Sequence, residues 1–354
     1  MTSDSKLAVM REVVSLEAKL SSLSFSHYGS IYFASDSVEG AVPAQIIGDV
    51  SPELKEKIAR TFTIGPSVDR SFWNKERSTM NISRGPCSSP EGYAISICHR
   101  EIAWIRQFAV PKAPDDPLCI PTAQNSPQEH VLLLEKYLKV VPRLFNIDRK
   151  FTRSVIWHSD LHSSNIFVDA RPSRLVDYQG DILLKRPDNF DDLDDKRKTE
   201  IKQQIFKSIL FQLYLIETGE RNPILAETFN LDHGKARRLL VEYAGDTCDD
   251  DIVSFRETLI NIERYWKELE VEGDCPIHFT EEDLRKHSQD AERWNEVQDF
   301  FNHIEGVVKR DGWKSSETYE AALQFFVDLR KVGLRNMKWK EREDFERQTR
   351  WAEK

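Results

Sequence analysis

Apolar residues in the first part of the chain follow first the spacing of a helix and then that of strands. Residues 7–23 carry a stripe of helical period, made of Val9, Val13, Leu16, Leu20 and Leu23. The segment 29–49 is predicted to form two short strands, joined as a hairpin by Asp36–Gly40. Residues 61–90 show no clear period, and irregular structure is expected there.

Two helices are predicted in the middle of the chain. One begins at Pro90 and continues through residues 101–109. The other follows Ser126 and Glu129, which have the spacing of a capping box, and has Pro127 at its first position. This second helix is strongly apolar and is expected to end near residue 141, after a proline- and aspartate-rich loop over 111–125.

The second half of the chain is predicted to be helical after three short strands. The strand patterns cover 154–158, 165–169 and 173–178. A buried stripe on the following helix is expected from Ile201, Ile205, Ile209, Leu213 and Ile216. Further helices are predicted at 234–243, 250–270, 281–308, 315–332 and 338–352. Asp249–Asp251 precede a helical pattern and are interpreted as an N-terminal cap rather than a metal cluster. The predicted fold class is therefore α+β and mostly helical.

Composition narrows the class of protein. The chain has 354 residues, of which 40% are apolar and 31% charged, as expected for a soluble globular protein. Its net charge of −9 argues against a nucleic-acid-binding face, and no apolar run reaches the length of a membrane span. The five cysteines are far apart and form no C-x-x-C pair, so neither a disulfide scaffold nor a zinc site is expected. The first residues show neither a secretory signal nor a transit peptide.

The candidate chemistry lies in the segment 157–181. There His158, Asp160 and Asn165 form the pattern H-x-D-x-x-x-x-N between two predicted strands. Phosphoryl transfer needs a group that orients the attacking hydroxyl and oxygen ligands for Mg²⁺. We place Asp160 and His158 in the catalytic group, and Asn165 and Asp177 among the metal and cofactor ligands.

Two other interpretations of this segment stay open. In the first, Asp160 and Asn165 only cap backbone amides of a loop. In the second, His158, Asp160 and His162 form H-x-D-x-H, a ligand pattern of hydrolytic metal sites. The histidines are otherwise scattered, which ranks a His/Asp metallohydrolase below a phosphotransferase.

These residues and their surroundings resemble the aminoglycoside phosphotransferase-like kinases. The resemblance is more specific to the fungal branch related to altered inheritance of mitochondria protein 9. It rests on GSIYF (29–33), IGPSVDRSFWNKER (64–77), RGPCSSPEGY (84–93), REIAWI (100–105), SPQEHVLLLEKYL (126–138), WHSDLHSSNIFVD (157–169), RPDNF (186–190) and DGW (311–313). The similarity extends over nearly the whole chain.

The resemblance implies a protein-kinase-like fold and an ATP·Mg site. Phosphate would pass to a hydroxyl of a small molecule, and the location would be mitochondrial, with the cytoplasm as the default otherwise. It divides the chain into a kinase-like large lobe over 1–310, with its core at about 126–220, and a helical extension packed on it over 311–354.

Two departures from the family pattern affect this interpretation. The small β-rich lobe, with its phosphate-covering loop and phosphate-pairing lysine, is not visible, so phosphoryl transfer is expected to be weakened or lost in this chain. The alternative is a catalytically inactive, pseudokinase-like module that binds a protein partner on the face where a small lobe would dock. Asp177 is either the true metal ligand or a substitute for one in an absent strand.

Overall fold

The computed structural model describes residues 3–111, 122–156, 182–248, 252–304 and 319–349. Within them the chain is mostly helical with two small antiparallel sheets, which confirms the predicted α+β class. The helices are α1 (Ser3–Ser21), α2 (Pro52–Thr61), α3 (Pro90–Phe108), α4 (Pro127–Leu144), α5 (Asp195–Arg221), α6 (Pro223–Phe229), α7 (Gly234–Asp246), α8 (Ile252–Arg264), α9 (Glu281–Ile304), α10 (Tyr319–Asn336) and α11 (Trp339–Gln348).

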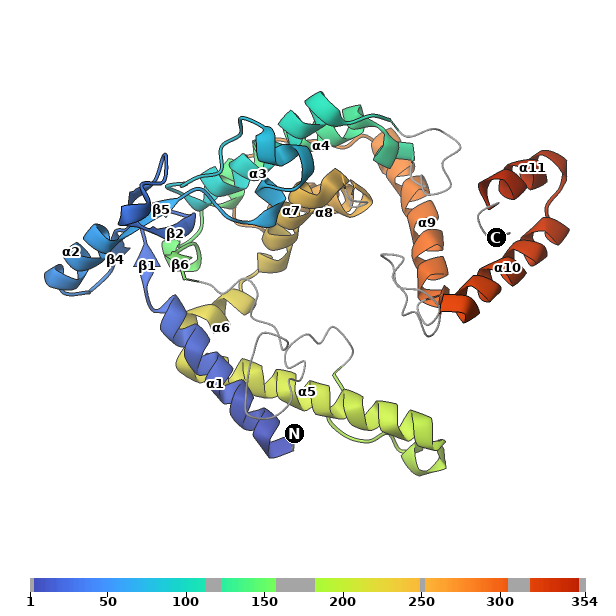
Figure 1. The fold of residues 1–354 in the computed structure, drawn as a ribbon, viewed down its shortest axis with the longest axis horizontal. Helices are drawn as coiled ribbons and strands as arrows, with labels where there is room; N and C mark the ends of the chain where they lie inside the picture. The colour runs from blue at the N-terminus through green and yellow to red at the C-terminus, as the bar shows by residue number, and fades with distance from the viewer. Residues whose placement is uncertain (1–2, 112–121, 157–181, 249–251, 305–318, 350–354) are drawn as a thin grey trace.

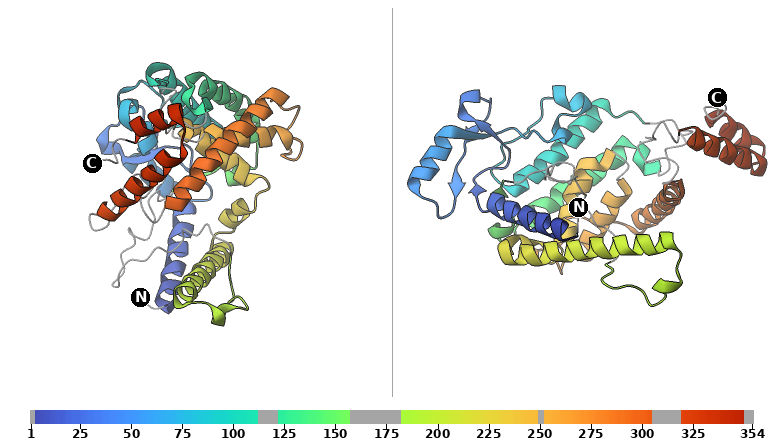
Figure 2. Two further views of the ribbon diagram at one scale, coloured as in Figure 1. Left: turned by 90° about the vertical axis from the view of Figure 1, so that its right-hand side faces the viewer. Right: turned by 60° about the horizontal axis from the view of Figure 1, so that its bottom comes forward.

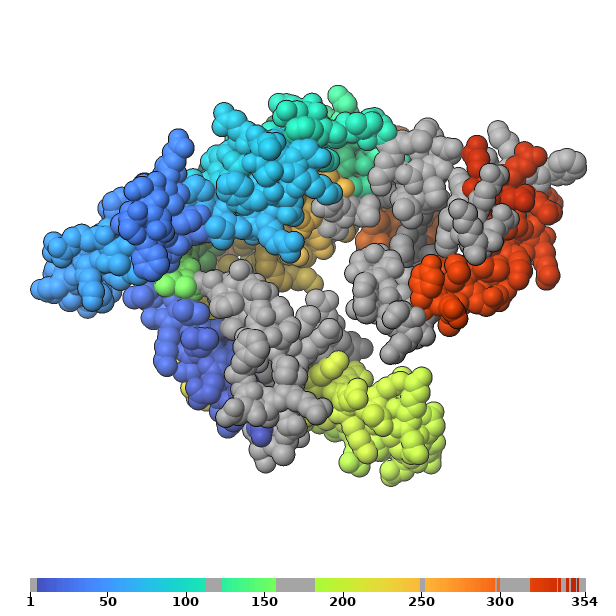
Figure 3. All heavy atoms as spheres, in the orientation of Figure 1, coloured from blue at the N-terminus to red at the C-terminus, as the bar shows by residue number. Residues whose placement is uncertain are grey.

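Each sheet has three strands. The first has the order β4–β1–β6, formed by Ile46–Ile47, Ser24–Phe25 and Ser154–Val155. The second has the order β2–β5–β3, formed by Ser30–Phe33, Phe62–Gly65 and Val42–Pro43. Both sheets lie at one end of the molecule, and α10 and α11 lie at the other (Figures 1 and 3).

The predicted hairpin within 29–49 is wrong. Strands β2 and β3 do not pair with each other, because β5 inserts between them and pairs with both. The segment between β2 and β3 begins with a short 3-10 helix, Ala34–Asp36, directly after β2. The partner strand comes from 61–90, which was predicted to be irregular and which also contains the 3-10 helices Arg70–Phe72 and Lys75–Thr79.

The main hydrophobic core lies between α3, α4, α7 and α8. Tyr137, Phe255, Leu134, Leu240 and Leu259 are among its fully buried side chains. Burying a large apolar side chain contributes roughly 1.5–3 kcal/mol, so this cluster is the main source of stability in the described part of the chain. Figure 1 shows the four helices grouped beside the strands, in the upper and central part of the view.

The start of α4 has one of the two hydrogen bonds of the predicted capping box. The Ser126 hydroxyl accepts a hydrogen bond from the Glu129 amide at 3.4 Å, and Pro127 occupies the first position. The Glu129 carboxylate contacts Arg256 of α8 and Lys286 of α9. Glu129 therefore connects α4 to α8 and α9.

Helix α1 packs along α5 and forms a second, smaller core (Figure 2). Its buried residues are Met10, Val14, Leu210 and Tyr214. The predicted stripe on α5 is wrong at Ile209 and Ile216, which are 41% and 58% exposed, whereas Leu213 packs against this core. Successive helix residues turn by about 100°, so the face with Leu210 and Tyr214 points away from Ile209 and Ile216.

The C-terminal helices follow the predicted order with shifted ends. Helix α8 ends at Arg264, six residues before the predicted end of that helix at residue 270. Helices α10 and α11 pack against each other. The expected boundary near residue 310, the continuation of α9 beyond 304 and the cap at Asp249–Asp251 lie outside the described residues.

Two further predictions concern the described residues. Cys87, Cys98 and Cys275 are free thiols, and Cys119 lies outside the described residues. Among the described helices, none combines the length and apolar character that a membrane span requires.

His130 is a titratable side chain buried in the core. This buried α4 side chain contacts the Thr247 hydroxyl through Nδ1 at 2.9 Å and the Gln124 carbonyl through Nε2 at 3.0 Å. A neutral ring satisfies both contacts, by donating from Nε2 to the carbonyl and accepting from the hydroxyl. Burial lowers the pKa of His130 below its usual value of 6.5, and the nearby Arg256 acts in the same direction.

We therefore expect His130 to stabilise the protein above its unfolded-state pKa and to lose that contribution as the pH falls below it. The sign follows because the unfolded chain takes up the proton first. Denaturant unfolding of wild type and His130→Gln, compared at about pH 7.5 and about pH 5.5, should show a smaller difference at the lower pH. The exposed His99→Gln variant serves as the control. An equal difference at both pH values would contradict this assignment.

Candidate binding cavity

A cavity of about 1320 Å³ lies between the helical core and the segment that leads into β6. Its wall combines parts of α3, α5, α6 and α7 with residues 145–153. Thr152 and Arg153 immediately precede β6, and both line the cavity. The cavity is therefore adjacent in sequence to the segment 157–181.

One part of the wall is aromatic. The Tyr28 and Tyr93 rings are stacked with centroids 6.2 Å apart, and Phe145 and Phe151 also line the cavity. The Tyr28 hydroxyl donates to the Thr152 carbonyl, and burial raises the pKa of Tyr28 to about 12. This hydroxyl consequently stays protonated at neutral pH and holds the start of β6 against the N-terminal strands.

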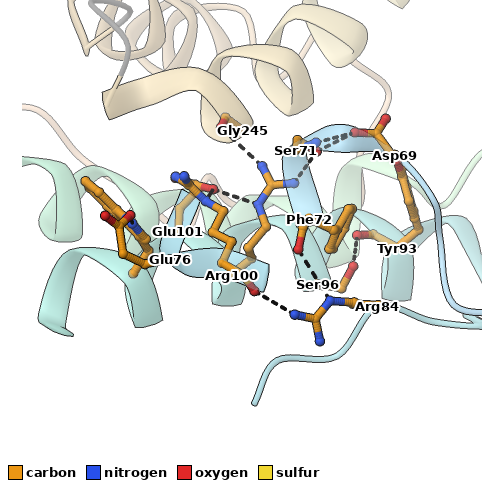
Figure 4. Close-up of polar contacts among 12 residues, drawn as sticks. Asp69, Ser71, Phe72, Glu76, Arg84, Tyr93, Ser96, Arg100, Glu101 and Gly245 are labelled. Carbon is orange, nitrogen blue, oxygen red and sulfur yellow. Dashed lines mark hydrogen bonds and ion pairs between the residues drawn. The ribbon is translucent and has the colours of Figure 1, made fainter. Parts of the chain in front are cut away.

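A buried carboxylate lies behind a second part of the wall and binds Arg100, which lines the cavity. Glu101 of α3 is fully buried and bonds to two arginines. Arg77 approaches it with Nη2 to Oε2 at 2.6 Å, and Arg100 with Nε to Oε1 at 2.6 Å. Two guanidinium groups thus share one carboxylate, as Figure 4 shows in part. Buried charges of this kind are tolerated only when paired and hydrogen-bonded.

Arg100 extends this network to the cavity surface. Its Nη1 donates to the Ser71 hydroxyl at 2.5 Å, and its Nη2 donates to the Gly245 carbonyl at 3.1 Å (Figure 4). The Asp69 carboxylate accepts from the Ser71 amide at 2.8 Å. Arg100 therefore joins the segment 69–71, α3 and the end of α7 at one place.

Arg77 and Arg84 fix the segment behind this wall. The Arg77 guanidinium lies over the Trp104 ring at 4.8 Å, and Trp104 donates to Glu76 at 3.0 Å. That hydrogen bond lowers the pKa of Glu76. Arg84 donates to the carbonyls of Phe72, Arg77 and other residues of the same segment, replacing the regular pairing that the segment lacks.

Helix α7 contributes a row of charged residues to the cavity. Lys235, Arg238, Glu242 and Asp246 recur at helical spacing and line it. Arg237 also lines the cavity, but it donates to the carbonyls of Leu144, Asp232 and Leu269. The charges on α7 therefore divide into one structural arginine and several side chains that face the cavity.

The site residues predicted from the sequence cannot be compared with this cavity. His158, Asp160, His162, Asn165 and Asp177 all lie outside the described residues. The described residues contain no cluster of three or more His, Cys, Asp or Glu side chains suited to a metal ion. The predicted Mg²⁺ ligands therefore stay a prediction.

The Arg77–Glu101–Arg100 cluster beside the cavity was not predicted, although the sequence carries a signal for it. Glu101 follows Ala94 and Ile97 at helical spacing, so it occupies a position on the buried face of α3. A carboxylate at such a position requires a cationic partner. The blocks 64–77 and 100–105, which carry the family resemblance, supply Arg77 and Arg100.

Comparison with known proteins gives relatives of low identity. A subtelomeric hrmA-associated cluster protein of Aspergillus fumigatus is 24% identical over 97% of this chain and 79% of its own length. Altered inheritance of mitochondria protein 9 is 23% identical in Zygosaccharomyces rouxii, over 83% of this chain, and 22% identical in Saccharomyces cerevisiae, over 86%. No family model and no solved structure matches the chain.

These relatives support the fungal branch that the sequence motifs indicate. The chain spans 53% and 56% of the two altered inheritance of mitochondria proteins, which is about half their length. Their names describe them as mitochondrial, which supports the mitochondrial location expected for this chain.

Proposed function

We propose that this chain is the part of a kinase-like phosphotransferase that binds the acceptor and carries the catalytic loop. The reaction is transfer of phosphate from ATP·Mg to a hydroxyl of a small molecule. The observation that carries the proposal is the position of the cavity: its wall includes Arg153, and the H-x-D-x-x-x-x-N pattern begins five residues later, at His158.

Separate residues are assigned to proton transfer, to metal binding and to binding of the acceptor. Asp160 orients the acceptor hydroxyl and takes its proton, and His158 belongs to the same loop. Asn165 and Asp177 supply oxygen ligands for Mg²⁺, which suits a hard cation. The aromatic part of the cavity holds the body of the acceptor and excludes water from it.

Nucleotide binding provides the test. Calorimetric titration with ATP is expected to show weak binding that requires Mg²⁺ and is lost in Asn165→Ala. The control is Asn295→Ala, at an exposed position on α9. Binding that is indifferent to Mg²⁺, or equal in wild type and Asn165→Ala, would overturn the assigned metal ligand. Absence of any binding would favour the second candidate.

The second candidate is a pseudokinase-like module that binds a protein partner. It is favoured by strand β2, where Ile31 and Phe33 point to one face and are 44% and 58% exposed. Exposed apolar side chains grouped on one strand are typical of contact surfaces. A partner captured by this face should be lost with Ile31→Ser and Phe33→Ser and retained with Asp160→Asn. The opposite pattern would exclude this candidate.

A further inference from the structure

Some of the charged side chains that line the cavity bond to other residues of the protein, and others do not. Among the described residues, five cationic side chains line it, namely Arg100, Arg153, Lys235, Arg237 and Arg238, against three carboxylates, Asp69, Glu242 and Asp246. This excess of positive charge stands out in a chain whose net charge is −9. The local balance therefore differs in sign from that of the whole protein.

Hydrogen bonding separates structural charges from available ones. Arg100 is held by Glu101, Ser71 and Gly245, and Arg237 by three backbone carbonyls. Arg153, Lys235 and Arg238 make no ion pair with any other residue that the structure describes. Within the described part of the chain, these three cations are therefore not neutralised by a carboxylate, and each lines the cavity.

Arg153 provides the most specific observation. Its Nε is buried and has no hydrogen-bond partner among the described residues. An unsatisfied buried donor costs free energy, and more so when the group is charged. An anionic oxygen in the cavity would remove this cost, since Arg binds phosphate and carboxylate through its planar fork of donors.

We propose that the cavity binds a small anionic molecule with a ring-shaped body, whose phosphate or carboxylate contacts Arg153, Lys235 and Arg238. The ring packs in the aromatic part of the wall formed by Tyr28, Tyr93 and Phe151. As an assignment of the acceptor class, this inference rests on the proposed function. As an assignment of a binding site, it is tested without nucleotide. It disfavours a polycationic acceptor, which three unpaired cations would repel.

Three probes with the same ring and different charges test the proposal. Naphthyl phosphate, naphthylmethanol and naphthylmethylamine carry an anionic, a neutral and a cationic group. Their binding to the full chain is measured by naphthyl fluorescence in the absence of ATP and Mg²⁺. The phosphate probe should bind at least about tenfold more tightly than the neutral one, because charged hydrogen bonds are the stronger kind. The cationic probe should bind most weakly.

Substitutions locate the contact. The double variant Lys235→Gln and Arg238→Gln, both at exposed positions, should weaken the phosphate probe about tenfold and leave naphthylmethanol unchanged. Arg153→Gln should act in the same direction, with Arg153→Lys restoring part of the affinity. Lys139→Gln and Arg264→Gln, on α4 and α8 outside the cavity wall, serve as matched controls.

The outcomes separate this proposal from the proposed function. Equal binding of the three probes, no binding, or cavity variants that behave like the controls would overturn the anion site. If the anion site holds and Asp160→Asn has no effect on phosphate transfer, the phosphotransferase assignment fails while the binding site stands.

Discussion

Replacing Glu101 by Gln is expected to destabilise the protein by about 3–5 kcal/mol, the range for removing one partner of a buried ion pair. The substitution keeps the shape of the side chain and removes its charge. Arg77 and Arg100 would then be left as two buried guanidinium groups without a counter-charge. Urea denaturation of wild type and variant measures the difference.

An exposed ion pair gives the matched control. Glu282 on α9 bonds to Arg285 through two oxygens, but both side chains are exposed to solvent. Glu282→Gln should therefore change stability little, because surface pairs are screened by water. If the two variants lost the same stability, the Arg77–Glu101–Arg100 cluster would not have the role assigned to it here.

Replacing Asp160 by Asn is expected to lower the already weak Mg²⁺-dependent release of phosphate from ATP by two to four orders of magnitude. This is the usual range for removing a group that transfers a proton in the rate-limiting step. The amide keeps the size of the side chain but cannot accept the proton of the attacking group. The expected loss follows from the proposed role of Asp160 and does not depend on the nature of the acceptor.

Steady-state measurement of phosphate release tests this expectation. Asp299→Asn, on α9, is the matched control, since α9 contributes no residue to the cavity wall. Its rate should equal that of wild type. If Asp160→Asn retained the wild-type rate, Asp160 would not be the catalytic acid–base group, and the loop would have the capping role that the sequence left open.

Local sequence signals predicted the helices well. Helix α3 begins at Pro90 after the capping residue Ser89, and α4 begins at Pro127 after Ser126, as proline position and capping preferences indicate. These features depend on neighbouring residues alone. The strand pairing was not predictable in the same way, because β5 reaches β2 from thirty residues away and replaces the local hairpin partner.

The buried face of α5 likewise could not be predicted from the local sequence. Its isoleucines form a stripe of helical period, but the position of α1 decides which face is covered. Helical period alone cannot predict this, since α5 also carries apolar residues such as Leu210 and Tyr214 on another face. The choice depends on a contact between segments almost two hundred residues apart in the chain.

The cavity was predictable only in part. Glu101 at a buried helical position, and the arginines in 64–77 and 100–105, could have been interpreted as a charge cluster. The grouping of Arg153 with Lys235 and Arg238 depends on the tertiary arrangement of β6 and α7. No short motif links those residues, so only the structure identifies them as parts of one wall.

Transfer of the labelled γ-phosphate of ATP to a small molecule tests the central claim most directly. The purified chain is incubated with labelled ATP, Mg²⁺ and a small-molecule extract of fungal mitochondria, and the products are separated by chromatography. Since transfer is expected to be weak in this chain, we predict a low yield of a labelled organic phosphate that requires Mg²⁺ and is absent with Asp160→Asn. Label found only in ATP and inorganic phosphate, to the same extent with wild type and Asp160→Asn, would contradict the account.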